Sequence, residues 1–111
     1  MMLTRSSTQF NPFLVTALVL FAFFASTEVF AERTGDKVFN TFCVACHLHG
    51  VAGAPQFGNA QDWQARMEKG MPTLLKHAIE GFNAMPPRGM CSNCSDDEIQ
   101  SAIQFMIDNS Q

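Results

Sequence analysis

A cysteine pair followed directly by histidine is the feature of this sequence with the most specific chemistry. Cys43, Cys46 and His47 form a C-x-x-C-H motif, the attachment signature of a c-type haem. Two thiols three positions apart lie on one side of a helical turn, so both can reach the vinyl groups on one edge of a porphyrin. The next residue, His47, then directs its imidazole at the iron. The motif predicts one covalently bound haem, with Cys43 and Cys46 as thioether sites and His47 as an iron ligand.

Three other uses of such a cysteine pair fit the sequence less well. A thioredoxin-type C-x-x-C motif needs a βαβ context, and the chain shows no alternating strand pattern. A zinc site built from all four cysteines would separate its two pairs by far more than the usual roughly 15–20 residues. A simple disulfide between Cys43 and Cys46 would leave His47 unexplained. Covalent haem attachment is therefore the favoured interpretation.

An iron bound on both faces of the haem needs a second ligand from elsewhere in the chain. His49 lies too close to His47 to reach the other face. The remaining candidates come later in the sequence, and they are Met71, Met85, Met90 and His77. Met85 is favoured because two prolines follow it, which disfavour helical geometry there and stiffen the loop that presents its sulfur. The residues alone favour Met85 and leave the other three as alternatives.

The elements that position these residues follow from hydrophobic periodicity and capping signals. Ser95 and Glu98 form a capping box, and apolar residues recur behind them at helical spacing. Loops rich in Gly and Pro are predicted over residues 50–58 and 81–90. The sequence predicts an all-α fold with about four helices around one covalently bound haem. The predicted helices span residues 35–42, 59–69, 73–80 and 95–108.

Length, charge and the N-terminus limit the class of protein. With 111 residues the chain has room for one domain, and a formal net charge of −3 argues against nucleic-acid binding. A polar start, an apolar run over residues 12–25 and the small residue Ala31 match a secretory signal with its cleavage site. We expect a signal peptide over residues 1–31, cleaved near Ala31, and a mature domain over residues 32–111. The alternative is a retained membrane anchor.

Six segments of the chain, taken together and in order, match a known family. They are residues 43–47, 53–55, 63, 69–71, 84–89 and 91–99. They resemble cytochrome c5, a family of class I c-type cytochromes of Gram-negative bacteria. The most specific part is the Met-Pro-Pro-Arg-Gly run, followed by a second C-x-x-C pair and an acidic helix start. The resemblance implies the small class I cytochrome c fold, His47 and Met85 as axial iron ligands, and a disulfide between Cys91 and Cys94.

The same resemblance suggests roles for residues around the haem. Pro55 matches the loop proline whose carbonyl accepts the Nδ1–H bond of the proximal histidine, which fixes the tautomer of the imidazole. Trp63 resembles the tryptophan whose indole N–H meets a haem propionate, with simple packing as the alternative. Arg88 is a candidate for propionate pairing or for a solvated loop charge. Gly35 and Phe39 resemble the pair at which the N-terminal helix crosses the C-terminal helix.

The expected function is electron transfer and not catalysis. With both axial positions filled the iron has no open site for a substrate, and no general acid, nucleophile or oxyanion hole is identifiable. We expect a soluble periplasmic carrier of one electron between respiratory partners, such as membrane quinol-oxidising donors and terminal reductases or oxidases. Nucleic-acid binding is not expected, nor membrane binding after signal cleavage. The alternatives are a haem protein with an open distal site, for gas binding or peroxidatic chemistry, and a membrane-anchored electron-transfer module.

Overall fold

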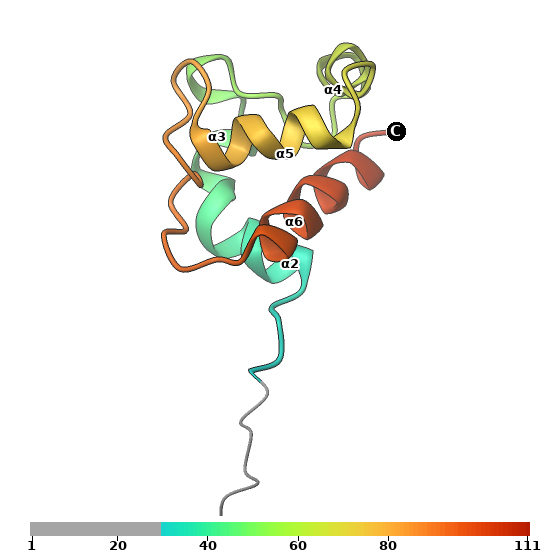
Figure 1. Ribbon diagram of the computed structural model, residues 1–111. Coiled ribbons are helices and arrows are strands. Elements are labelled where there is room, and N and C mark those ends of the chain that lie inside the picture. Colours follow the sequence, from blue (N-terminus) through green and yellow to red (C-terminus); the bar gives the residue numbers. More distant parts are fainter. Residues whose placement is uncertain (1–29) are drawn as a thin grey trace, which may run out of the picture. The chain divides into compact units, whose positions relative to one another are not determined.

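Residues 30–111 are described by the structure, a computed structural model (Figure 1). The predicted signal peptide therefore lies outside the described residues, except for its last two positions. Residues Ala31–Gln111 form a compact unit. None of the helices in this described part is long and apolar enough to cross a membrane.

Helices make up the regular secondary structure of the described part. Within residues 30–111 the β-type pairing is limited to an isolated bridge between Phe82 and Met85. The prediction of an all-α fold is confirmed. The elements are α2 (Gly35–Val38), the π-helical turn η1 (Phe39–Cys43), α3 (Val44–His47), the 3-10 turn η2 (Val51–Gly53), α4 (Ala60–Met67), α5 (Met71–Glu80) and α6 (Asp96–Asp108).

The first predicted helix lies where the sequence places it, but it is not a regular α-helix over its whole length. Helix α2 passes without a break into η1 and then into α3 (Figure 1). The side chains of Asn40 and Thr41 donate to the carbonyl groups of Asp36 and Lys37, at 2.7 Å in both cases, where the main-chain pattern changes. A π turn widens the helix by an extra residue, and such turns occur frequently at functional sites. Here the turn ends at the first cysteine of the haem motif.

The starts of the three later helices show which sequence signals were reliable. The side chain of Asn59 caps α4 by accepting from two main-chain N–H groups of its first turn, at 3.1 and 3.2 Å. Ser95 and Glu98 form the predicted capping box at α6. Helix α5 begins earlier than predicted, at Met71, with Pro72 in its first turn. Proline is tolerated there because the amides of the first turn have no acceptor within the helix.

Helices α2 and α6 cross in the lower half of the domain, and Gly35 permits their close approach (Figure 1). A Cβ atom built on Gly35 would fall directly on the main-chain carbonyl of Ser101 in α6. Phe39, one turn later, is buried and packs against Phe105 of α6 with 5.5 Å between the ring centroids. The crossing therefore joins the segment that carries the haem motif to the C-terminal helix.

Candidate functional site

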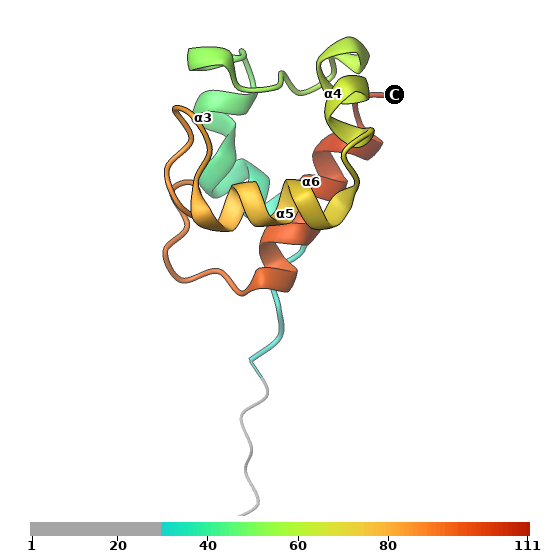
Figure 2. The same cartoon turned by 45° about the horizontal axis from the view of Figure 1, so that its top comes forward.

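One cavity brings the predicted cofactor-contacting residues together. Its volume is about 270 Å³, and its wall is contributed by α3, α4, α5, α6 and the adjoining loops. Figure 2 shows how these helices are arranged. Most of the side chains that line it are apolar, and none of the lining residues that the structure describes is acidic. The predicted residues in the wall are Cys43, Cys46, His47, Pro55, Trp63, Met85 and Arg88.

The two thiols of the C-x-x-C-H motif lie at different depths in this wall. Both are free cysteines, with Cys43 half-buried and Cys46 exposed. Burial, with a smaller effect of Cys46, raises the pKa of the Cys43 thiol to about 11, so the thiol is protonated at neutral pH. The Cys43 Sγ atom contacts the carbonyl oxygen of Val38 at 3.8 Å, across the π turn. One inner and one outer thiol suit attachment along one edge of a planar cofactor.

His47 is buried and its ring is oriented by a loop. The Nδ1 atom lies 3.0 Å from the carbonyl oxygen of Pro55. Because a carbonyl can only accept, Nδ1 carries the hydrogen, and Nε2 is left as the nitrogen with a lone pair. Burial lowers the pKa of His47 from its usual value; the bond to Pro55 opposes this effect, and the charge of Arg66 adds to it. A neutral imidazole with a fixed tautomer is the form that binds a metal.

The structure separates the candidates for the second iron ligand. Met71 lies in the first turn of α5 and is not part of the cavity wall. Met90 is 70% exposed. The His77 ring stacks on the Phe82 ring, with 4.0 Å between centroids. Met85 is half-buried in the wall, and its main chain exchanges two hydrogen bonds with Phe82, at 2.9 and 3.0 Å. Among the three predicted methionines, Met85 is therefore the one that is both half-buried and in the cavity wall.

Trp63 and Arg88, both expected near a propionate, lie in the cavity wall and make hydrogen bonds within the protein. The indole N–H of buried Trp63 donates to the carbonyl oxygen of Gln56 at 3.1 Å. Arg88 donates through Nη2 to the carbonyl of Cys94 at 2.7 Å and to the carboxylate of Asp96 at 2.8 Å. Arg88 thus connects the loop after α5 to the start of α6 and is not a solvated charge.

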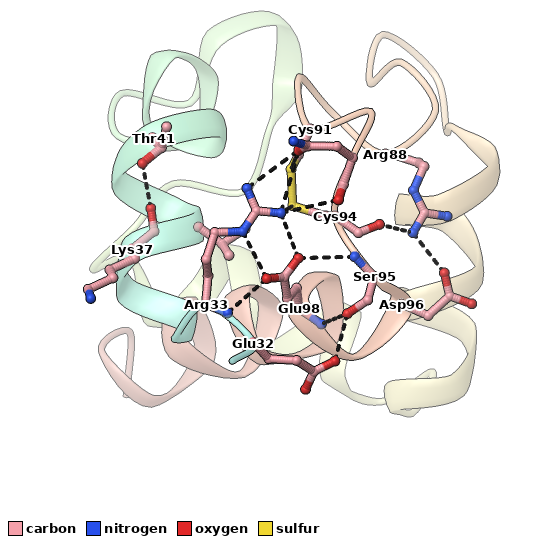
Figure 3. A network of polar contacts seen from close by, with 12 residues as sticks. Glu32, Arg33, Lys37, Thr41, Arg88, Cys91, Cys94, Ser95, Asp96 and Glu98 are labelled. Carbon is pink, nitrogen blue, oxygen red and sulfur yellow. Dashed lines mark hydrogen bonds and ion pairs between the residues drawn. A yellow bond between two sulfur atoms is a disulfide. The ribbon is translucent and has the colours of Figure 1, made fainter. Parts of the chain in front are cut away.

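The second cysteine pair forms a short disulfide hairpin before α6. Cys91 and Cys94 are joined by a disulfide, the pairing that the resemblance implies, which removes two of the four thiols that a zinc site would need. Arg33 lies beside this hairpin and forms an ion pair with buried Glu98, with 2.7 Å between Nη2 and Oε2 (Figure 3). The sequence does not predict this pair, because its members are 65 residues apart and neither lies in a motif that points to the other.

Replacement of Glu98 by glutamine tests the electrostatic role of this pair. The hydrogen bonds from the Arg33 side chain and main chain lower the pKa of Glu98 from its ordinary value of 4.5 to about 2. A carboxylate with a lowered pKa stabilises the fold above its ordinary pKa, and loses that effect as the pH falls through the lowered value. We therefore expect Glu98→Gln to lower the urea midpoint at pH 7, and the difference from the wild type to shrink between about pH 4.5 and about pH 2.

The measurement is urea unfolding of both proteins over this pH range. Asp97→Asn is the matched control, because Asp97 is exposed in the same first turn of α6. A constant difference between Glu98→Gln and the wild type at all pH values would contradict the role assigned to the carboxylate.

The residues in the cavity wall fit a covalently attached haem. The wall supplies two free thiols for the vinyl groups of the haem, and imidazole and thioether side chains for its iron, His47 and Met85 among them. The cationic side chains of the wall, Arg66, Lys69 and Arg88, have no acidic neighbour among its described residues and suit a cofactor that bears carboxylates. The apolar remainder suits the porphyrin ring.

Comparisons with known proteins agree with this arrangement. The family model described as "Cytochrome C oxidase, cbb3-type, subunit III" matches residues 30–106. A cytochrome c5 of Ectopseudomonas mendocina is 46% identical over 76 residues, which cover 67% of this chain and 87% of the relative. A cytochrome c5 of Azotobacter vinelandii is 44% identical over 76 residues, covering 67% of this chain and 92% of the relative.

Solved structures show the same fold. A chain in a crystal structure of an electron transfer complex of nitrite reductase with cytochrome c superimposes with a TM-score of 0.67 at 33% identity, covering 74% of this chain and 100% of that chain. A mono-heme ferrocytochrome c from Shewanella putrefaciens superimposes with a TM-score of 0.63 at 40% identity, with the same coverage of 74% and 100%.

Proposed function

Because this chain belongs to the cytochrome c5 family of class I c-type cytochromes and binds one covalent haem c, we propose that it carries single electrons between redox proteins of the periplasm. His47 and Met85 are the proposed axial ligands, and Cys43 and Cys46 the proposed thioether sites. The observation that best supports this proposal is that all four of these side chains line one cavity, whose remaining wall is mostly apolar.

The proposed ligand set explains a carrier better than an enzyme. When bound, the haem iron supplies reversible one-electron exchange between its ferrous and ferric states. His47, fixed by Pro55, and the Met85 thioether occupy both axial positions in this proposal, so no position is left for a substrate. A neutral thioether stabilises ferrous iron and raises the reduction potential, and exclusion of water by the apolar wall adds to this effect.

The surface around the cavity supports contact with redox partners. Three apolar side chains of the cavity wall are exposed, namely Val51 at 50%, Phe82 at 46% and Met90 at 70%. Such side chains suit the small, transient interfaces of electron-transfer complexes. The structural relative found in a complex with nitrite reductase supports a terminal reductase as one class of acceptor. Membrane quinol-oxidising proteins are the proposed class of donor.

The proposed location depends on cleavage of the N-terminal segment. Cleavage after Ala31 would leave Glu32 as the first residue and a mature domain over residues 32–111. The intact mass of the protein purified from whole cells tests this step. A mass that includes residues 1–31 would support a membrane-anchored module instead.

Redox-monitored absorption spectroscopy of the haem-loaded protein tests the proposed function. We expect one reversible one-electron transition, low-spin spectra in both states, and the weak far-red band of methionine ligation in the ferric protein. Axial ligands set the reduction potential of a haem over a range of about 0.8 V. We expect the potential of this protein to lie toward the oxidising end of that range. A high-spin ferric spectrum that changes when small ligands are added would support an open distal site and overturn the carrier proposal.

A further inference from the structure

The disulfide hairpin between the Met85 loop and α6 is held by an arginine on each side (Figure 3). Arg88 reaches it from the Met85 loop, through the carbonyl of Cys94. Arg33 reaches it from the segment before α2, which is otherwise remote from the loop in sequence. Neither Arg33 nor its buried partner Glu98 lies in the cavity wall or in the haem attachment motif.

The Arg33 guanidinium makes two sets of contacts at once. Towards α6, its Nε and Nη2 atoms donate to the two carboxylate oxygens of Glu98, at 2.8 and 2.7 Å. Towards the hairpin, Nη2 donates to the carbonyl of Asn93 at 3.2 Å and contacts the Sγ atom of Cys94 at 3.5 Å, while Nη1 lies 3.4 Å from the Asn93 side-chain oxygen. Glu98 therefore fixes the plane of the guanidinium, and the guanidinium fixes the hairpin.

The hairpin is joined to the Met85 loop by short main-chain contacts. The N–H of Gly89 donates to the carbonyl of Pro86 at 2.9 Å, and the N–H of Cys91 donates to the carbonyl of Arg88 at 3.1 Å. These two consecutive turns hold the residues between Met85 and the hairpin. A displacement of the hairpin would therefore be transmitted to the loop that presents the sulfur of Met85, which is also bonded to α5 through the Arg88 N–H and the Ala78 carbonyl at 2.7 Å.

We propose that Arg33 is a positioning residue for Met85, which it holds in place by fixing the disulfide hairpin against Glu98 and the start of α6. The inference rests on the proposed function in one respect, that Met85 binds the iron. Arginine suits this role because its planar fork reaches the carboxylate and the hairpin together, which the single ammonium group of lysine cannot do.

The rate at which imidazole displaces Met85 from the ferric haem measures this positioning. Displacement requires the Met85 loop to open, and it is followed by stopped-flow absorption as the loss of the far-red band. We expect Arg33→Gln to raise this rate roughly tenfold, the factor that corresponds to one charge-assisted hydrogen bond. Glu32→Gln is the control, because Glu32 lies in the same segment and contacts Ser95 instead of the hairpin. Its rate is expected within about twofold of the wild type.

Arg33→Lys separates positioning from simple charge compensation, and it also covers the case in which Arg33→Gln does not fold. Lysine keeps a positive charge beside Glu98 but loses the fork. We expect Arg33→Lys to recover most of the urea midpoint while it retains the fast imidazole rate. Recovery of both quantities, or an Arg33→Gln rate within about twofold of the wild type, would overturn the proposal.

The wild-type spectrum distinguishes this failure from failure of the proposed function. Absence of the far-red band in the wild-type ferric protein would remove Met85 as a ligand before any variant is made. A normal wild-type band with unchanged rates in both Arg33 variants would reject the role of Arg33 alone.

Discussion

Substitution of Met85 by alanine is expected to abolish the far-red band of the ferric protein and to lower its reduction potential by about 0.1 V or more. The thioether is the neutral, soft ligand that stabilises ferrous iron, so water or another ligand in its place favours the ferric state. Met85 is half-buried in the cavity wall and held by two main-chain bonds to Phe82. The truncation should therefore leave the surrounding loop in place and remove mainly the sulfur. Absorption spectra and a redox titration of the same sample measure both effects.

Two other methionines provide the controls for this substitution. Met90 lies in the cavity wall but is 70% exposed, and Met71 lies outside the wall in the first turn of α5. Met90→Ala and Met71→Ala are expected to retain the far-red band. If Met85→Ala kept the band and Met90→Ala lost it, the ligand would be Met90, and the proposed arrangement of the loop would be incorrect.

The parts of the site that the sequence predicted are those whose geometry depends only on residues close together in the chain. The spacing of Cys43, Cys46 and His47 fixes their relation within one or two helical turns, and no distant contact is needed to place them. The capping box of Ser95 and Glu98 is likewise local, and the structure contains it. The family resemblance added the pairing of the second cysteine pair, which spacing alone left undetermined.

The parts that the sequence did not predict depend on chain register or on distant contacts. The π turn over Phe39–Cys43 adds one residue to a helix too short for its apolar stripe to reveal the change. Helix α5 begins earlier than the sequence predicts, because a proline after Met71 is compatible both with a loop and with the first turn of a helix. The Arg33–Glu98 pair joins residues 65 positions apart, and the capping role of Glu98 had already explained that carboxylate.

The connection between Arg33 and the hairpin also changes the interpretation of the acidic start of α6. Acidic side chains in the first turn of a helix generally interact favourably with the positive end of its dipole. Two of them have specific partners, since Glu98 pairs with Arg33 and Asp96 pairs with Arg88. Each partner arginine also contacts the Cys91–Cys94 hairpin. The two arginines therefore link both sides of the hairpin to acidic side chains at the start of α6.

Replacement of Gly35 by alanine is expected to destabilise the fold by about 3 kcal/mol, the upper end of the range for overpacked sites. The new methyl group would overlap the main-chain carbonyl of Ser101, and a main-chain atom cannot move aside as a flexible side chain can. Helices α2 and α6 would have to separate, which loosens the packing of Phe39 against Phe105. Urea unfolding of the ferric protein, followed by circular dichroism, measures the loss.

Lys37→Ala is the matched control for Gly35→Ala, because Lys37 is exposed on the same short helix. We expect this change to alter stability by no more than about 0.5 kcal/mol. Since Gly35 is not part of the cavity wall, the far-red band of folded Gly35→Ala protein is expected to remain, in contrast to that of Met85→Ala. A Gly35→Ala protein as stable as the wild type would show that the crossing of α2 and α6 tolerates a wider spacing, and that the close contact is not what joins the haem motif to the C-terminal helix.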